Sequence, residues 1–203
     1  LLKADPGLVL PFPTAPVEWC PTGRRYVGEL RPGLHPWHDA GVYYIQEPSA
    51  MAVAEIAAPR PGERVLDLCA APGGKTSHLA SLAGDGCLLI SNEIHPQRAR
   101  ILSRNVARMG IRSAAVLNVS PHRQVERVPG FFDCIVVDAP CSGEGMFRKE
   151  PVALEEWSEE NVALCARRQD EILEAALEML APGGRLIYST CTFAPDEGEG
   201  TLS

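Results

Sequence analysis

The sequence predicts an α/β fold, a doubly wound and mostly parallel sheet with helices on both faces. Two observations lead to this prediction. Short apolar runs such as Ile135-Val-Val, typical of strands buried on both faces, alternate with longer segments of helical periodicity. Several runs also end abruptly in polar residues or glycine, and ligands bind at this carboxyl edge in open α/β sheets. We therefore expect a Rossmann-like domain whose site lies at the ends of its strands.

The elements can be assigned in order along the chain. Residues 1–47 contain many prolines and no sustained periodicity, so we expect an extended arm with short strands or turns, packed on the core. Residues 48–203 are expected to form the main domain. The first helix, 48–58, has an apolar side formed by Met51, Val53, Ala54 and Ile56. Further helices are expected at 74–83, 96–109 and 162–180, and strands at 64–68, 87–91, 114–118, 132–137 and 185–190.

Composition limits the classes of protein that fit. A chain of 203 residues with 45% hydrophobic and 22% charged residues is typical of one large globular domain. The net charge of −7 argues mildly against a nucleic-acid partner. No apolar run approaches the roughly 18 residues of a membrane span, so no membrane association is expected.

Cysteine usage and the chain ends give further expectations. The seven cysteines form no Cys-x-x-Cys pair, so we expect neither a metal site nor a disulfide framework, and free thiols indicate a reducing cytoplasm. The chain begins at Leu1 and stops at Thr201-Leu-Ser, shortly after a predicted strand. We expect a monomeric fragment of a longer protein, in which the last strands of the sheet are missing.

The segment VLDLCAAPGGKT, which begins at Val65, indicates a cofactor loop between a strand and a helix. Gly73 and Gly74 allow close approach of the backbone to a ligand, and the helix N-terminus offers free N–H groups. Glu93 ends the next predicted strand 20 residues after Gly73, where a carboxylate can accept hydrogen bonds from both ribose hydroxyls. The segment matches neither G-x-G-x-x-G nor a P-loop. These features favour a nucleoside cofactor over an incidental loop.

A carboxylate and two thiols also follow predicted strands. Asp138 and Cys141 stand in VDAPCSGEG, directly after one strand, and Cys191 in YSTCT ends the last one. A lone buried cysteine before a turn is most often a packing residue. Two cysteines at the same sheet edge are candidates for one pocket.

The motifs LDLCAAPGGKT, NE, VDAPCSGEGMFRK and YSTCTFAPDEGEG together strongly resemble those of the RNA (cytosine-5)-methyltransferases of the NOL1/NOP2/Sun family. The resemblance is greatest to their bacterial ribosomal-RNA branch. GVYYIQEPSAM is similar to the segment that precedes the cofactor loop, so the resemblance covers essentially the whole chain. It implies a catalytic domain over 48–203, S-adenosylmethionine as cofactor and RNA, most specifically 16S ribosomal RNA, as substrate. We expect the fragment by itself to be weakly active or inactive.

The resemblance also implies roles for individual residues. In the family's chemistry a thiolate attacks C6 of cytosine so that C5 can take the methyl group. Cys191 is implied as this nucleophile, Cys141 as the residue that assists product release, and Asp138 as a partner of the pyrimidine edge. Lys75 is implied near the pocket, against a thiolate or a pyrimidine oxygen, and is the one cation expected to lower the thiol pKa. The implied cofactor-binding residues are Cys69, Ala70, Ala71, Pro72, Gly73, Gly74, Lys75, Glu93 and Asp138.

One position departs from the family pattern. Many relatives carry an Asp after the third strand, next to the adenine, whereas this chain has Leu117-Asn-Val-Ser-Pro. We expect Asn118 or Ser120 to take the place of that Asp as a neutral hydrogen-bonding group.

Three other classes of protein stay open at this point. Amino-methylating enzymes use Asn/Asp-Pro-Pro-aromatic after the fourth strand, where this chain has Asp138-Ala-Pro-Cys. The absent aromatic residue and the added thiol disfavour this class. A nucleotide-dependent oxidoreductase is disfavoured by the absence of a dinucleotide fingerprint. A cofactor- and RNA-binding scaffold without activity is disfavoured because both cysteines and Asp138 are intact.

Overall fold

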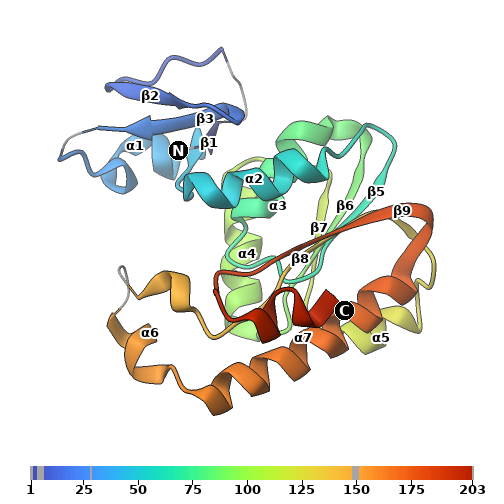
Figure 1. Ribbon diagram of the computed structural model, residues 1–203. Coiled ribbons are helices and arrows are strands. Elements are labelled where there is room, and N and C mark those ends of the chain that lie inside the picture. The colour runs from blue at the N-terminus through green and yellow to red at the C-terminus, as the bar shows by residue number, and fades with distance from the viewer. Residues whose placement is uncertain (1, 4–6, 28, 148–150, 203) are drawn as a thin grey trace.

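The computed structural model describes residues 2–3, 7–27, 29–147 and 151–202 (Figure 1). The last two residues of VDAPCSGEGMFRK, 148 and 149, lie outside the described residues. The main sheet has five parallel strands in the order β7-β6-β5-β8-β9. They are β5 (Arg64–Asp67), β6 (Leu88–Asn92), β7 (Ala114–Leu117), β8 (Phe132–Asp138) and β9 (Leu180–Ser189). The chain therefore reverses its direction of winding between β5 and β8, and the predicted doubly wound parallel fold is confirmed.

Helices cover both faces of this sheet, with α2 and α3 on one side and α5 and α7 on the other (Figure 1). Successive side chains of each strand point to opposite faces of the sheet and so contribute to two separate hydrophobic cores. Val65 packs against α2 and α3, whereas its neighbour Leu66 packs toward α7. α4 packs against β7 through Leu102 and Val106. The helices are α2 (Pro48–Ala57), α3 (Gly74–Ala83), α4 (Pro96–Arg108), α5 (Pro121–Val125), α6 (Pro151–Glu156) and α7 (Glu159–Met179).

Apart from shifts of one residue at the ends of several elements, the predicted elements differ from the observed ones chiefly in four places. α7 begins at Glu159 rather than at 162, because the Ser158 side chain accepts a hydrogen bond from the Asn161 amide and caps the helix. β9 begins at Leu180, since residue 180 already pairs with Phe132 before a register shift. The short helices α5 and α6 were not expected. Ile56 was expected on the apolar side of α2, but 70% of it is exposed because Met51, Ala54 and Ala57 form the buried side.

The N-terminal residues form a second sheet beside the main one (Figure 1). Its antiparallel strands, in the order β2-β3-β1-β4, are β1 (Leu2–Lys3), β2 (Thr14–Val17), β3 (Cys20–Tyr26) and β4 (Tyr43–Tyr44). Tyr43 is fully buried and its hydroxyl donates to the Pro32 carbonyl at 2.7 Å. The division of the chain into an arm, 1–47, and a catalytic domain, 48–203, stays a prediction.

Short helical turns complete the chain. They are α1 (Pro36–Asp39) and the 3-10 helices η1 (Pro32–Leu34), η2 (Gly84–Gly86), η3 (Glu144–Met146), η4 (Pro195–Glu197) and η5 (Gly200–Leu202). Over the described residues, no helix is both long and apolar enough to span a bilayer.

Candidate active site

A cavity of about 670 Å³ opens at the carboxyl edge of the main sheet, beside the point between β5 and β8 where the winding reverses. This is the position at which open α/β sheets bind their ligands. Segments that follow all five strands contribute to its wall. The predicted site residues that line it are Cys69, Ala71, Glu93, Ser120, Asp138, Cys141 and Cys191.

The loop between β5 and α3 contains three more predicted cofactor residues, Ala70, Pro72 and Gly73. Gly73 has φ +112°, a left-handed conformation that favours glycine, and a Cβ there would lie 3.1 Å from Leu102 Cδ1. Gly74 begins α3. Ala70 is buried, and its amide donates to the Asn92 carbonyl at 2.8 Å. The Pro72 carbonyl accepts from Asn105 Nδ2 at 2.8 Å. These contacts fix the loop between α3, β6 and α4.

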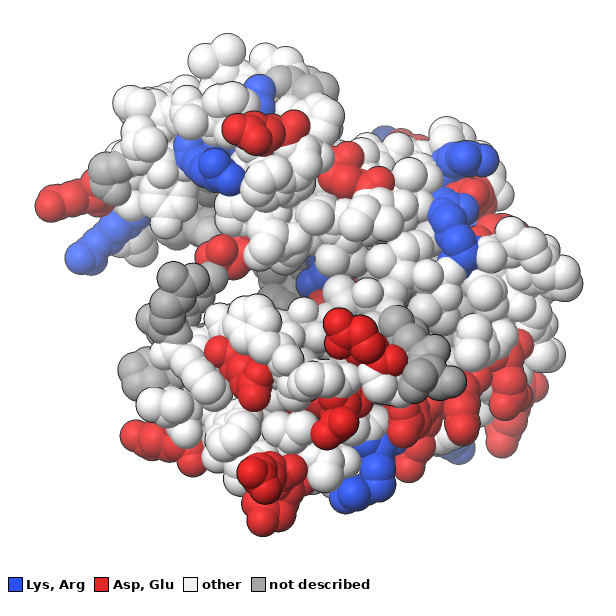
Figure 2. All heavy atoms as spheres, in the orientation of Figure 1, with Lys and Arg blue, Asp and Glu red and all other residues white. Residues whose placement is uncertain are grey.

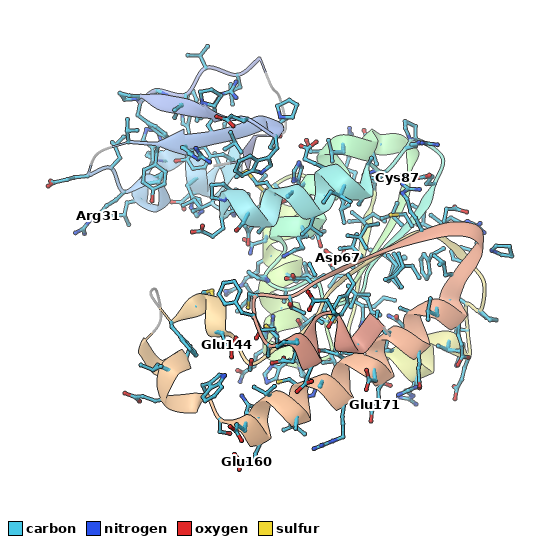
Figure 3. All side chains as sticks on the ribbon, in the orientation of Figure 1. Arg31, Asp67, Cys87, Glu144, Glu160 and Glu171 are labelled. Carbon is cyan, nitrogen blue, oxygen red and sulfur yellow. The ribbon has the colours of Figure 1, made fainter. Side chains whose placement is uncertain are left out.

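Asp67, which was not among the expected site residues, stabilises this loop by a hydrogen bond to α3. It is the last residue of β5 and is fully buried (Figure 3). Its Oδ2 accepts a hydrogen bond of 2.6 Å from Thr76 Oγ1, at the start of α3. Burial raises the pKa of Asp67 to about 6. The motif LDLCAAPGGKT contains Asp67, but the sequence does not show whether this carboxylate faces a ligand or the interior. Its complete burial in the structure shows that it faces the interior.

Glu93 lies at the end of β6 with only 3% of its surface exposed. Its Oε1 accepts from the His95 amide at 2.9 Å, and Oε2 lies 3.6 Å from Arg98 Nη2. A buried carboxylate held in this way at the cavity wall is suited to accept hydrogen bonds from ligand hydroxyls.

The structure separates the two residues expected to replace the family's aspartate. Asn118 Nδ2 donates to the backbone carbonyls of Glu93, at 2.6 Å, and Ile94, at 2.9 Å. Its amide therefore ties β7 to the turn after β6, and Asn118 is not among the residues that line the cavity. Ser120 does line the cavity. Of the two, Ser120 is placed for a ligand contact.

Asp138, at the end of β8, is held from two sides. Lys75 Nζ donates to its Oδ2 at 2.6 Å, and Ser189 Oγ donates to its Oδ1 at 2.8 Å. The Lys75 side chain is 13% exposed and does not line the cavity itself. Lys75 thus acts on the cavity through Asp138, whose carboxylate it orients.

The two thiols expected in one pocket lie side by side, with Cys141 Sγ 3.1 Å from Cys191 Sγ. The Cys191 amide also donates to Cys141 Sγ at 3.4 Å. The hydrogen bond from Cys141 lowers the pKa of Cys191 to about 7, and Lys75 contributes less. The same contact, together with burial, raises the pKa of Cys141. Lys75, the cation expected to lower the thiol pKa, does lower the pKa of Cys191, but by less than Cys141 does, and its Nζ is paired with Asp138.

Contacts between the segments after β8 and β9 hold these thiols together. The Gly145 amide donates to the Cys191 carbonyl at 2.8 Å, and a Cβ at Gly145 would lie 2.7 Å from that oxygen. Ser142 Oγ lies 3.0 Å from Thr192 Oγ1. Glu144 (Figure 3) accepts from the Phe193 amide at 3.0 Å through Oε2 and from Trp157 through Oε1. The two cysteine motifs are therefore one interlocked unit.

Glu197 fastens this unit to α7. It is fully buried, and its Oε2 accepts from the Ser142 amide and from Gln169 Nε2, each at 2.9 Å. The Tyr188 hydroxyl donates to the Glu197 backbone carbonyl at 2.9 Å. Sequence reasoning missed Glu197, because its neighbours in PDEGEG are equally acidic and only the fold buries this one.

Replacing Glu197 with alanine is expected to lower the free energy of unfolding by roughly 2–4 kcal/mol, because two buried donors lose their acceptor. Urea unfolding monitored by circular dichroism measures the change. Glu199→Ala is the matched control, since Glu199 is exposed and its loss is expected to change stability by less than about 0.5 kcal/mol. Equal stabilities of the two variants would contradict the role given to Glu197.

The cavity wall also contains residues that sequence reasoning did not single out. They come from the segments that follow β5, β6, β7 and β8 and from α7: Leu68, Ile94, His95, Arg98, Pro121, His122, Ala139, Pro140, Arg168, Glu171 and Ile172. Arg168, Glu171 and Ile172 lie on α7. The helical periodicity of the sequence predicts α7 but does not show that the side of α7 with these residues faces the carboxyl edge of the sheet.

Solved structures with the same fold define the class of protein. A methyltransferase homolog protein from Pyrococcus horikoshii is 33% identical, with a TM-score of 0.82 over 95% of this chain and 60% of its own. NSun6 from the same organism, solved with SFG, is 29% identical, with a TM-score of 0.77 over 87% of this chain and 44% of its own. The fold is that of the Rossmann-like, S-adenosylmethionine-dependent methyltransferases.

Sequence comparison gives the family. Residues 54–203 match the family model described as 16S rRNA methyltransferase RsmB/F. The ribosomal RNA small subunit methyltransferase F of Serratia proteamaculans is 39% identical over 189 residues, and that of Salmonella arizonae 40% over 190 residues. Each alignment covers 91% of this chain and 40% of the relative. The chain therefore belongs to the RsmB/F family, which confirms the resemblance seen in its motifs, and spans about 40% of the length of these relatives.

Proposed function

We propose that the protein to which this chain belongs transfers a methyl group from S-adenosylmethionine to C5 of a cytosine in RNA. The observation that carries this proposal is the pair of thiols 3.1 Å apart beside Asp138, at the carboxyl edge of a methyltransferase sheet. We propose 16S ribosomal RNA as the substrate, in line with the names of the family and of its curated relatives.

The residues at the sheet edge fit the cofactor. The cavity of about 670 Å³ lies within the usual range for nucleoside-sized ligands. Glu93 is buried at the position suited to ribose hydroxyls, and Cys69 and Ala71 of the loop after β5 line the same cavity. Cys69 to Gly74 would lie along the methionine part and Ser120 near the adenine. Bound there, S-adenosylmethionine would supply an electrophilic methyl group.

Cytosine C5 is a poor nucleophile, and this is why the pair of thiols matters. The Cys191 thiolate forms a bond to C6, which places electron density on C5 and enables C5 to take the methyl group. The Asp138 carboxylate accepts a hydrogen bond from the protonated pyrimidine edge as charge builds on the ring, and Lys75 holds its orientation. Once Cys191 is bonded to C6, it no longer accepts the hydrogen bond from Cys141, and the Cys141 thiol releases its proton to solvent. The resulting Cys141 thiolate takes the C5 proton, which restores the double bond and expels Cys191 as thiolate. One proton is released overall, and both cysteines return to their starting forms.

A second thiol is what favours C5 methylation over methylation of the exocyclic amine. Amine methylation needs no covalent adduct and makes no use of a thiol with a pKa of about 7. Assay of the full-length protein with RNA tritiated at cytosine C5 tests the distinction. C5 methylation releases tritium to water in step with methyl incorporation. Methyl incorporation without tritium release would overturn the proposal in favour of amine methylation.

Methyl transfer is expected to depend on pH through Cys191. The thiolate is the reactive form, so kcat/KM should rise about tenfold per pH unit below the pKa of about 7 and level off above it. Single-turnover rates over a pH series measure this profile. Because the hydrogen bond from Cys141 is the largest cause of the low pKa, the inflection should move upward in Cys141→Ala. A profile whose inflection stays near 9 in the wild type would contradict this role for Cys141.

We further propose that segments outside this chain supply most of the RNA-binding surface. The chain has a net charge of −7, and Figure 2 shows acidic side chains gathered over α7. Exposed acids on this helix are Glu159, Glu160, Asp170, Glu171, Glu174 and Glu178. Salt-dependent RNA affinity that appears only in the full-length protein would support this arrangement. We propose a monomer that acts in the cytoplasm, where its RNA substrate is made.

A further inference from the structure

Three side chains of metal-ligating type meet away from the active site, where the N-terminal sheet contacts the main domain. Cys20 begins β3, Glu55 lies on α2 and His78 lies on α3. Figure 1 shows these elements next to one another, with α2 between β3 and α3. One ligand atom from each residue lies within 4.8 Å of the other two. We propose that Cys20, Glu55 and His78 bind a zinc ion that fastens the N-terminal sheet to the main domain.

The spacing of the ligand atoms fits this ion. Cys20 Sγ lies 3.7 Å from His78 Nε2, and His78 Nε2 lies 3.0 Å from Glu55 Oε1. Tetrahedral zinc with ordinary bond lengths separates thiolate and imidazole ligand atoms by about 3.6 Å and imidazole and carboxylate atoms by about 3.4 Å. Both distances are therefore within a few tenths of an ångström of zinc geometry, the Cys20 and Glu55 ligand atoms lie within 4.8 Å of each other, and water would take the fourth position. Thr22 Oγ1, 3.6 Å from Cys20 Sγ, is placed to donate to the thiolate.

Burial distinguishes this cluster from a chance group of surface acids. Cys20 and the His78 side chain are fully buried, whereas the Glu55 side chain is 22% exposed, so the cluster meets solvent at Glu55. Burial raises the pKa of Cys20 and lowers that of His78, so without metal both are neutral. Neutral imidazole is the form that ligates, and a divalent ion would displace the thiol proton. Thiolate, imidazole and carboxylate together are donors that suit zinc.

The hydrogen-bond partners of the ligating residues affect how strongly zinc is expected to bind. Nε2 of His78 faces Cys20 and Glu55, so a bound ion leaves the ring proton on Nδ1. Nδ1 is buried and has no hydrogen-bond partner within the described part of the chain. Outer partners of this kind are worth about 10- to 100-fold in metal affinity. We therefore expect binding weaker by that factor than at a fully supported site.

The test uses cobalt and zinc in a background that removes the thiol pair of the active site, Cys141→Ser/Cys191→Ser. Cobalt should bind at about one equivalent with a thiolate-to-cobalt charge-transfer band and the visible bands of tetrahedral cobalt. Zinc should displace it and, at a hundredfold excess over its dissociation constant, raise the thermal midpoint by about 5–10 °C. Absence of binding, or binding without the thiolate band, would overturn the proposal.

Single variants then assign the ligands. Cys20→Ser should abolish the charge-transfer band and the zinc-dependent rise in thermal midpoint. Glu55→Gln keeps a hydrogen-bonding partner for His78 at a partly exposed position, so it should fold normally yet bind cobalt at least about tenfold more weakly. Cys165→Ser, at a buried cysteine of α7 far from the cluster in sequence, is the matched control and should behave as the background does. Unchanged metal binding in Cys20→Ser would place the ion elsewhere and refute the site.

Discussion

Replacing Cys191 with alanine is expected to reduce methyl transfer to RNA by at least about 10³-fold, because the covalent route to an electron-rich C5 is lost. The expected loss falls on kcat, since Cys191 acts on the bound base. Full-length protein, radiolabelled S-adenosylmethionine and ribosomal RNA from cells that lack the gene provide the assay. Cofactor affinity should stay within about twofold of the wild type, because Glu93 and the Gly73 loop are untouched.

The matched control for this substitution is Cys165→Ala, at a thiol that does not line the cavity. It should retain methyl transfer while reporting the cost of removing a buried cysteine. Methyl transfer by Cys191→Ala at more than about a tenth of the wild-type rate would show that the nucleophile is misassigned. Methylation of the exocyclic amine would then become the better interpretation of the site.

Replacing Cys141 with alanine is expected to trap a covalent protein–RNA adduct. Attack by Cys191 on C6 needs only the Cys191 thiolate, whereas release needs a group that takes the C5 proton. In the wild type, Cys141 Sγ lies 3.1 Å from Cys191 Sγ. Without the Cys141 thiol, the methylated adduct should accumulate instead of turning over. Denaturing gels of labelled RNA and protein show it as a slowly migrating band. The reaction is run at mildly alkaline pH, so that Cys191 ionises without the hydrogen bond from Cys141.

Two further variants make this result specific. The double variant Cys141→Ala/Cys191→Ala should give no adduct, because the bond to C6 is made by Cys191. Ser142→Ala removes the hydroxyl contact with Thr192 next to the thiol pair, and it should turn over without a trapped species. Adduct formation by the double variant, or free turnover by Cys141→Ala, would contradict the roles of the two thiols.

The sequence by itself determined the fold class and the order of most elements. Strand and helix periodicities, and the glycine or polar residues that end each run, are local properties, so α3 was predicted with its observed bounds, 74–83. The placing of polar groups at one sheet edge also follows from sequence, because parallel strands end on the same side. Asp138, Cys141 and Cys191 could therefore be expected in one cavity, and the structure brings these three residues together.

Tertiary structure alone decided which neighbours these residues have and which groups are buried. The low pKa of Cys191 comes mainly from Cys141 rather than Lys75, because folding pairs Lys75 with Asp138. Glu197 is buried while Glu199 is exposed, although their local sequences are alike. The side chains of Cys20, Glu55 and His78, which we propose as zinc ligands, come together although Cys20 and His78 are 58 residues apart in the chain. Contacts between segments distant in sequence depend on how the layers pack, and no local pattern of residues encodes that packing.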